Sequence, residues 1–213
     1  MVARPRLLDL FCCEGGASMG YHQAGFDVMG VDIAARPRYP FEFHRGDALS
    51  FLGAHGHEFD AIHASPPCQA FTNAQRLQGN EHPDLIGPTR AMLLMFNLPY
   101  VIENVPGAPV RPDLELCGGM FGLRTYRHRL FESNVPLTAP THPAHVARTT
   151  KMGRPPRPGE FMHIVGNFSG IAQGREVMGM EWASRDGLRE AIPPAYTEYI
   201  GRQLITHIQE KAA

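Results

Sequence analysis

Short apolar runs in the first half of the chain alternate with stretches that are helical or marked by glycines. The runs that predict buried strands are residues 6–11, 26–33, 41–44, 58–65 and 99–105. Two stretches predict helices, a short one that opens after Gly15 and Gly16 and a longer one over residues 89–97. This alternation favours an α/β fold with a mostly parallel sheet and helices on both faces, whose ligands lie outside the carboxyl ends of the strands.

The second half begins with a stretch that excludes long regular elements. Residues 133–160 hold six prolines among scattered basic groups, which predicts a loop or a very small subdomain. Order resumes at residues 161–168, and the stretch from Pro193 onward predicts a closing amphipathic helix. We therefore divide the chain into a core over residues 1–131, a reduced segment over 132–174, and C-terminal helices over 175–213 that complete the core.

Composition narrows the class of protein. The 213 residues suit one domain, and with 43% apolar and 19% charged residues the chain is too apolar to be disordered. No apolar run approaches the roughly 18 residues of a membrane span, and the N-terminus has no long apolar block ending in a cleavage site. We expect a soluble, cytoplasmic protein that does not bind membranes, and a monomer.

Neither the cysteines nor the histidines predict a metal site. The four cysteines include no CxxC pair, so they signal neither a zinc knuckle nor a disulfide framework. Among the 11 histidines, the pairs His55 with His57 and His142 with His145 lack a partner cluster at ligand spacing. We therefore expect no bound metal and a reducing compartment.

A glycine-containing turn after the first strand predicts a nucleotide-bearing cofactor. The sequence DLFCCEGG leads from strand to helix, and Asp32 follows 23 residues after Asp9, at the end of the second strand. Glycines let the backbone approach a ligand, and an acid at that place accepts hydrogen bonds from ribose hydroxyls. Taken alone, the pattern also fits a tight turn between strand and helix with exposed acids.

A cysteine and a glutamate follow two later strands. In SPPCQ, over residues 65–69, two prolines stiffen the backbone before Cys68, where a thiolate could act as a nucleophile. The alternative is an inert, buried cysteine. Glu103 and Asn104 also fall at the carboxyl end of a strand, which places an acid beside the thiol. This pairing indicates covalent attack assisted by protonation.

Four segments, in this order, resemble the motifs of one enzyme family. DLFCCEGG, SPPCQ, IENV and RTYRHRLF are similar to motifs I, IV, VI and VIII of the C5-cytosine DNA methyltransferases. The resemblance covers residues 7–131 and, more weakly, 174–204. It implies a Rossmann-like fold that uses S-adenosylmethionine and an enzyme that methylates C5 of cytosine in DNA.

The resemblance also implies a role for each residue of the reacting centre. Cys68 would add to C6 of cytosine, and Glu103 would donate a proton or a hydrogen bond to N3. Arg129 would hold the cytosine O2, Arg127 would support the catalytic loop or a phosphate, and Asn104 would orient the loop that bears Cys68. The released product would be 5-methylcytosine.

For S-adenosylmethionine the family pattern places Phe11 against the adenine, Asp32 on the ribose hydroxyls and Asp47 on the adenine amino group. Gly15 and Gly16 would let the methionine part lie close to the backbone. The remaining expected contacts are Asp9, Ile33, Ala48 and Pro67.

DNA is the expected partner. A cytosine inside a duplex must be flipped out before a thiolate can reach C6, and the polar stretch after Cys68 suits a lid over the flipped base. Residues 124–160 carry a net charge of +5 against −6 for the remainder, so they would meet phosphates unless they form a merely solvated loop. The expected DNA contacts are Gln69, Arg124, Arg148, Lys151, Arg154 and Arg157.

Departures from the family pattern limit the expectation. Cys13 stands where glycine is usual, Thr125 where glutamine is usual, and Glu190 where an asparagine near the methionine carboxylate is usual, so Glu190 would repel that carboxylate unless it turns away. Only about 43 residues occupy the place of the recognition domain, which predicts low sequence specificity or a specificity partner. The alternatives are the same chemistry on RNA or a free cytosine nucleotide, or a non-catalytic binding protein.

Overall fold

The computed structural model describes residues 3–67, 84–151 and 153–212. In this part of the chain seven strands form one sheet in the order β3-β2-β1-β4-β5-β7-β6. The strands are β1 (Arg6–Leu10), β2 (Asp27–Asp32), β3 (Glu42–Arg45), β4 (Ala61–Ala64), β5 (Tyr100–Asn104), β6 (Leu114–Leu116) and β7 (Arg129–Ser133). Strands β1 to β5 are parallel, while β7 runs antiparallel to both β5 and β6.

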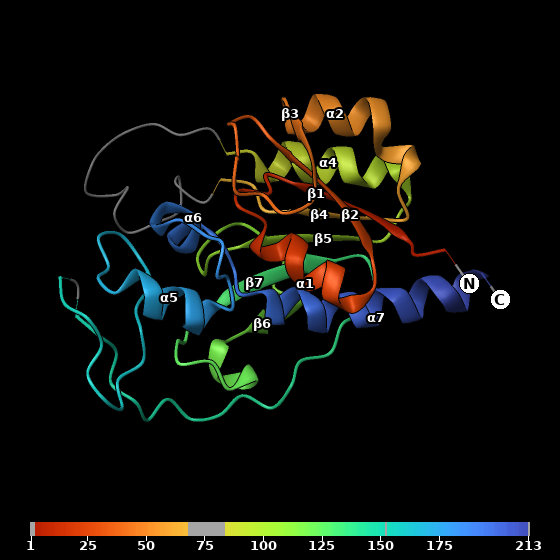
Figure 1. Ribbon diagram of the computed structural model, residues 1–213. Helices are drawn as coiled ribbons and strands as arrows, with labels where there is room; N and C mark the ends of the chain where they lie inside the picture. The colour runs from red at the N-terminus through yellow and green to blue at the C-terminus, as the bar shows by residue number, and fades with distance from the viewer. Residues whose placement is uncertain (1–2, 68–83, 152, 213) are drawn as a thin grey trace.

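Helices cover both faces of the sheet, as predicted (Figure 1). On one face lie α2 (Ala48–His55) and α4 (Ile86–Phe96), and on the other α1 (Gly16–Ala24) and α7 (Pro194–Ala212). Because side chains alternate along a strand, Leu7 packs into the core beside α1 and α7 while Leu8 packs into the core beside α2. Two short 3₁₀ turns, η1 (Gly56–Glu58) and η3 (Gly118–Phe121), complete this part of the fold.

Helices α1 and α7 cross at backbone distance. A Cβ atom at Gly20 would lie 2.0 Å from the carbonyl oxygen of Pro194 and 2.2 Å from Oγ1 of Thr197, so only glycine fits there. The Thr197 hydroxyl in turn donates to the carbonyl of Ala17, 2.8 Å away. The predicted closing helix is therefore fixed against the helix that opens after Gly15 and Gly16.

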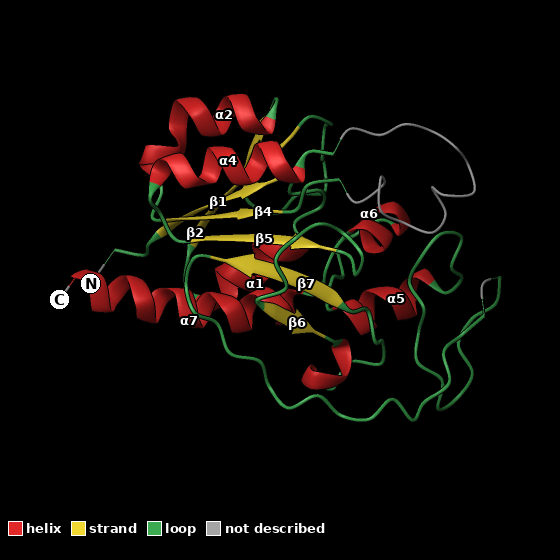
Figure 2. Ribbon diagram, turned by 180° about the vertical axis from the view of Figure 1, so that it is seen from behind, coloured by secondary structure: helices red, strands yellow, loops and turns green. Residues whose placement is uncertain are grey.

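The proline-rich segment extends along one side of the molecule (Figure 2). Between β7 and α5 (Ile171–Met178) it has no helix or strand among its described residues, only an isolated bridge between Thr149 and Phe161. Its end joins α5 and α6 (Arg185–Glu190) around a third apolar cluster that includes Met162, Ile164 and Leu188. The division into three segments stays a prediction.

A buried ion pair ties α4 to β7. Glu132 is 0% exposed and accepts hydrogen bonds from Nε and NH2 of Arg90 at 2.7 and 2.6 Å, and from the backbone of Arg111 at 2.9 Å. Burial raises the pKa of Glu132, but these hydrogen bonds outweigh the effect of burial and hold the pKa below its usual range.

No helix among the described residues is long and apolar enough to span a membrane.

Candidate active site

The first of two neighbouring cavities opens at the carboxyl ends of β1, β4 and β5. Its lining includes Asp9, Phe11, Gly16, Ser65, Glu103 and Glu190. These residues come from four separate segments of the chain, and parallel strands bring the ends of three of these segments to one edge of the sheet. The cofactor turn and the acid predicted to react with the base therefore border the same space.

Backbone strain is concentrated in this turn. Phe11 and Cys13 have positive φ angles of 60° and 49°, a region that side chains rarely adopt and that is often occupied at functional sites. The positive φ of Cys13 explains why glycine would be the easier residue there. The spaces beside Gly15 and Gly16 are taken by the protein itself, since added Cβ atoms would lie 3.0 Å from Tyr39 and 2.5 Å from the carbonyl of Ile192.

The residues at the end of β2 combine an acid with an apolar surface. The buried carboxylate of Asp32 accepts hydrogen bonds from the backbone N–H groups of Cys13 at 3.0 Å and Ala34 at 2.9 Å. Next to it Ile33 is 74% exposed and offers an apolar side chain to the surroundings of Asp32. Such a pair suits a ligand with both hydroxyl groups and an apolar ring.

Glu190 has a positively charged neighbour, Arg36, that the sequence analysis missed. Arg36 pairs with Asp32 at 3.1 Å and reaches Glu190 at 3.7 Å, and the Cys13 thiol donates to Glu190 at 3.1 Å. Glu190 therefore turns toward Arg36 and Cys13, which removes the isolated negative charge that the sequence suggested. No motif marked Arg36, because its partners lie four residues away on one side and more than 150 on the other.

Asp47 and Ala48 have local structural roles beside any role toward a ligand. Asp47 caps α2 by accepting from the backbone N–H of Ser50 at 2.8 Å, and the hydrogen bonds of this cap lower the pKa of Asp47. The methyl group of Ala48 is buried in the core. Pro67 is exposed.

The pKa of Asp9, which lines the first cavity, departs strongly from its usual value. It is fully buried, accepts a hydrogen bond from the Ser18 hydroxyl through Oδ2, and has no partner for Oδ1 among the described residues. Burial, with a smaller contribution from the charge of Asp32, raises the pKa of Asp9 to about 7. A buried carboxylate oxygen without a donor indicates a place where a ligand's donor or positive charge would be stabilised.

We expect Asp9→Asn to stabilise the ligand-free protein at pH 8. Because folding raises the pKa of Asp9, the stability that its protonated form provides below about pH 4 is lost as pH rises toward 7. Asparagine cannot ionise and can still accept from Ser18, so the variant should gain up to about 4 kcal/mol at pH 8 and almost nothing at pH 4. Urea unfolding at both pH values measures the difference. The exposed Asp27→Asn is the matched control, and equal gains at pH 4 and pH 8 would refute the expectation.

Glu103 and Arg129 form the ion pair at the centre of the site. The Nε of Arg129 lies 2.9 Å from Oε1 of Glu103, and only 7% of Glu103 is exposed. Arg129 begins β7 and Glu103 lies near the end of β5, two strands that pair antiparallel with Glu103 opposite Phe131. This pairing brings the two predicted catalytic residues together although 25 residues separate them.

Hydrogen bonds fix residues 65 and 66, which come just before Cys68 in the chain. Nδ2 of Asn104 donates to the carbonyl of Pro66 at 2.9 Å, and Ser65 bonds to the buried His63 at 2.9 Å. His63 also bonds to the hydroxyl of Tyr21, and burial lowers the pKa of His63 to about 3, so its ring is neutral. The sequence analysis missed His63, which no motif includes. Cys68 and Gln69 lie outside the described residues.

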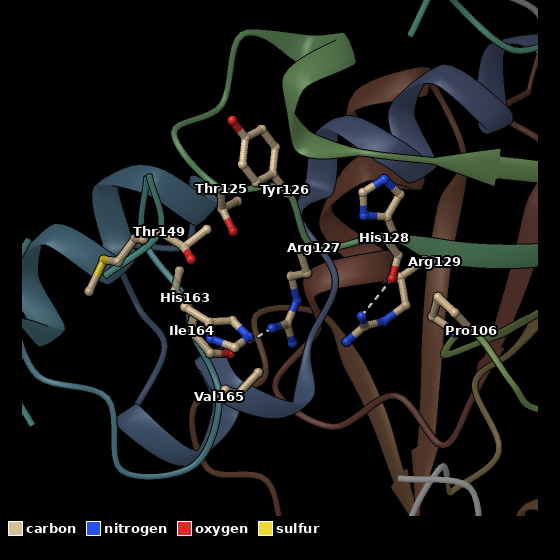
Figure 3. A pocket seen from close by; sticks show the side chains of 11 residues that line it. Pro106, Thr125, Tyr126, Arg127, His128, Arg129, Thr149, His163, Ile164 and Val165 are labelled. Carbon is tan, nitrogen blue, oxygen red and sulfur yellow. Dashed lines mark hydrogen bonds between the residues drawn. The ribbon is translucent and has the colours of Figure 1, made fainter. Parts of the chain in front are cut away.

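Arg127 connects three segments near a second cavity. Its guanidinium donates to the carbonyls of Ile164 at 2.7 Å and Arg189 at 2.7 Å, and also to Ala191. The cavity has a volume of about 310 Å³ and lies between residues 125–129, which lead into β7, and residues 162–165, which follow the proline-rich segment (Figure 3). Sequence reasoning assigned no role to residues 162–165, because they match no motif.

The basic residues predicted to meet DNA are only partly gathered. Arg154 forms a double hydrogen bond with Glu160 at 2.6 and 2.7 Å, and Arg124 donates to the carbonyl of Glu160 at 3.3 Å. Arg148, Lys151 and Arg157 are exposed. Glu160 thus offsets part of the positive charge that the sequence count places in this segment.

Comparison with solved structures identifies the fold. A putative DNA modification methyltransferase encoded within a prophage of E. coli has a TM-score of 0.67 at 16% identity, over 96% of this chain and 99% of that one. The Dnmt2 methyltransferase of S. pombe has a TM-score of 0.62 at 12% identity, over 99% of each chain. The Entamoeba histolytica methyltransferase EhMeth has a TM-score of 0.55 at 10% identity, over the full length of both chains.

The sequence matches no protein-family model and no curated protein. The fold assignment rests on the mostly parallel seven-stranded sheet of the described residues, the helices on both of its faces, and these superpositions. The chain has a Rossmann-like methyltransferase fold.

Proposed function

We propose that this protein is a DNA cytosine-5 methyltransferase that uses S-adenosylmethionine and reads little sequence around its target. The observation that carries the proposal is the position of Glu103. Its side chain borders the cavity of the cofactor turn and pairs with Arg129, which lines the second cavity. A base in the second cavity would lie beside both the acid and the methyl donor, as transfer between two bound molecules requires.

The residues that line the first cavity, together with Asp32 and Ile33 next to its Cys13, fit S-adenosylmethionine. Phe11 and the exposed Ile33 offer apolar faces to adenine, and the carboxylate of Asp32 retains acceptor capacity for ribose hydroxyls. The unpartnered oxygen of Asp9 suits the positively charged methionine end. Bound there, S-adenosylmethionine would supply an electrophilic methyl group on a sulfonium.

The proposed catalytic residues overcome the low nucleophilicity of C5. Cys68 adds its thiolate to C6, and Glu103 offsets the charge that builds on the ring by a proton or hydrogen bond at N3. Arg129 holds O2 of the base while it keeps Glu103 in place. After C5 has taken the methyl group, loss of the C5 proton to a base breaks the Cys68–C6 bond and releases 5-methylcytosine.

The second cavity suits a flipped base. Its volume of about 310 Å³ is at the lower end of the range for ligand pockets, and Arg127 and Arg129 border it. A base inside a duplex must leave its stack to enter such a cavity. Exposed Arg148, Lys151 and Arg157 supply positive charge for phosphates, while residues 132–174 are too few for a large base-reading element.

Methyl transfer from labelled S-adenosylmethionine to duplex DNA, transfer RNA and dCMP tests the proposal. We expect labelled 5-methylcytosine in DNA, with binding that weakens steeply between about 50 and 200 mM salt. Bisulfite sequencing of the product would give the target, which we expect to span one or two base pairs beside the cytosine. Preferred labelling of RNA or dCMP would refute DNA as the substrate, and no transfer by protein that binds S-adenosylmethionine would refute the activity.

A further inference from the structure

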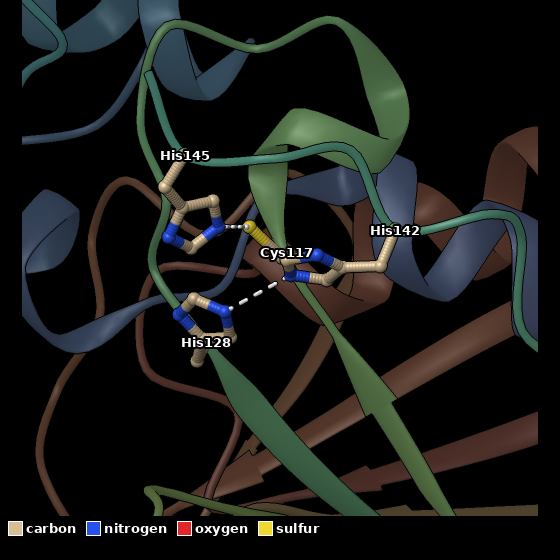
Figure 4. Close-up of side chains that lie close together, drawn as sticks. All are labelled: Cys117, His128, His142 and His145. Carbon is tan, nitrogen blue, oxygen red and sulfur yellow. Dashed lines mark hydrogen bonds between the residues drawn. The ribbon is translucent and has the colours of Figure 1, made fainter. Parts of the chain in front are cut away.

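One cysteine and three histidines converge away from the reacting centre. Cys117 follows β6, His128 stands just before β7, and His142 and His145 belong to the proline-rich segment (Figure 4). One ligand atom from each, the cysteine sulfur or a ring nitrogen, lies within 4.8 Å of all the others. The fold therefore collects four metal-ligating side chains from three separate parts of the chain.

We propose that Cys117, His128, His142 and His145 bind a structural zinc ion that joins the proline-rich segment to residues 127–129 at the start of β7. The proposal does not depend on the methyl acceptor. It departs from the sequence-based expectation of no metal, which considered His142 and His145 without the two residues that the fold brings to them.

Two of the distances between ligand atoms already match a tetrahedral ion, and all of them are within 4.8 Å. Sγ of Cys117 lies 3.3 Å from Nε2 of His145, and Nε2 of His128 lies 3.2 Å from Nε2 of His142. Zinc bonds of about 2.3 Å to sulfur and about 2.0–2.1 Å to nitrogen place neighbouring ligand atoms of a tetrahedron roughly 3.3–3.6 Å apart. One thiolate with three imidazoles is a ligand set that favours zinc over hard cations such as Mg²⁺ and Ca²⁺.

The surroundings position the ligands before any ion binds. Tyr126 stacks on the His145 ring at 3.7 Å, and its hydroxyl exchanges hydrogen bonds of 3.0 and 2.9 Å with the backbone of Ala147. Pro143 follows His142 and packs close to Gly119 in η3, where an added Cβ atom would lie 3.2 Å from the proline ring. The carboxylate of Glu115 lies close enough to interact electrostatically with both Cys117 and His128. Its negative charge would offset the positive charge of a zinc site that has one thiolate.

Few side chains of the proline-rich segment are buried, so a bound metal ion would help to order it. A stretch as long as residues 134–160, whose described residues form no helix or regular strand, is uncommon in a compact domain and costs conformational entropy to order. A metal ion that joins such a segment to a sheet contributes its binding free energy to folding.

The position of His128 links this site to the second cavity. His128 lies between Arg127 and Arg129, and all three line that cavity. A zinc ion on His128 would hold residues 127–129, which present the two arginines, and would anchor the proline-rich segment, which leads to the opposite wall at residues 162–165. Loss of the ion should therefore loosen the target cavity while the cofactor turn stays intact.

Metal analysis of the purified full-length protein tests the proposal. We expect about one zinc per chain after dialysis in chelator-free buffer. In cobalt-loaded protein we expect the absorption of tetrahedral cobalt with a thiolate charge-transfer band, and Cys117→Ser should lose that band. Protein without zinc that also fails to take up Zn²⁺ or Co²⁺ after treatment with a chelator would overturn the proposal.

Variants of exposed ligands avoid the risk of unfolding a core residue. His142→Ala and His145→Ala should each lower the zinc affinity at least about tenfold and speed proteolysis within residues 134–160, with circular dichroism near that of the wild type. His57→Ala removes an exposed histidine outside the cluster and is the matched control. Equal zinc retention in all three variants would overturn the proposal, since the metal would then lie elsewhere.

Discussion

Cys68→Ala is expected to abolish methyl transfer, lowering the turnover rate by roughly 10⁴-fold or more. Alanine cannot form the bond to C6, and without that bond C5 is too poor a nucleophile to take the methyl group. The described lining of the first cavity comes from other residues, so we expect the variant to bind S-adenosylmethionine as the wild type does. Labelled methyl transfer to DNA and direct binding of the cofactor measure the two effects separately.

A covalent trap identifies the nucleophile directly. DNA with 5-fluorocytosine stops the reaction after methyl transfer, because fluorine cannot leave as the C5 proton does. The wild-type protein should then stay attached to the DNA through residue 68, as peptide mapping would show, while Cys68→Ala should form no adduct. An adduct on Cys12, Cys13 or Cys117, or normal turnover by the variant, would contradict the assignment.

Local sequence patterns predict much of the fold. Apolar runs predict each end of β1 and of β2 to within one residue. The stretch from Pro193 predicts α7, which begins at Pro194. These elements bury continuous apolar surface or end at prolines and glycines, so their signals lie within a few residues. The pattern analysis predicted no helix at α2, and it gave no bounds for α5 and α6 within or beside the C-terminal helices expected over residues 175–213; all three helices are short and bury few side chains.

Other features could not be read from the sequence because they depend on distant partners. The roles of Arg36 and of Arg127 appear only when β2, β7 and the region around α6 lie together, since Arg36 pairs with Glu190 and Arg127 donates to Arg189. The metal-ligand cluster is similar, since 10, 13 and 2 residues separate Cys117, His128, His142 and His145 in turn. Such spacing matches no common zinc motif, so only the fold reveals it.

The ion pair of Glu103 with Arg129 leads to the second large effect. Glu103→Gln is expected to lower the rate of methyl transfer by about 10²–10⁴-fold, the usual contribution of a positioned general acid. The amide oxygen can still accept from Nε of Arg129, which keeps the side chain in place, but the amide cannot deliver a proton to N3. The affinity for S-adenosylmethionine and the melting temperature should change little.

Single-turnover kinetics with matched variants separates this chemical role from a structural one. Glu42→Gln, an exposed change on β3 at the amino-end side of the sheet, should leave the rate unchanged. Glu103→Gln should also form the trapped adduct with 5-fluorocytosine DNA at least about tenfold more slowly, because proton donation at N3 assists the attack by Cys68. If the variant instead attacks C6 at the wild-type rate, or loses transfer only because the protein unfolds, Glu103 has no direct part in activating the base.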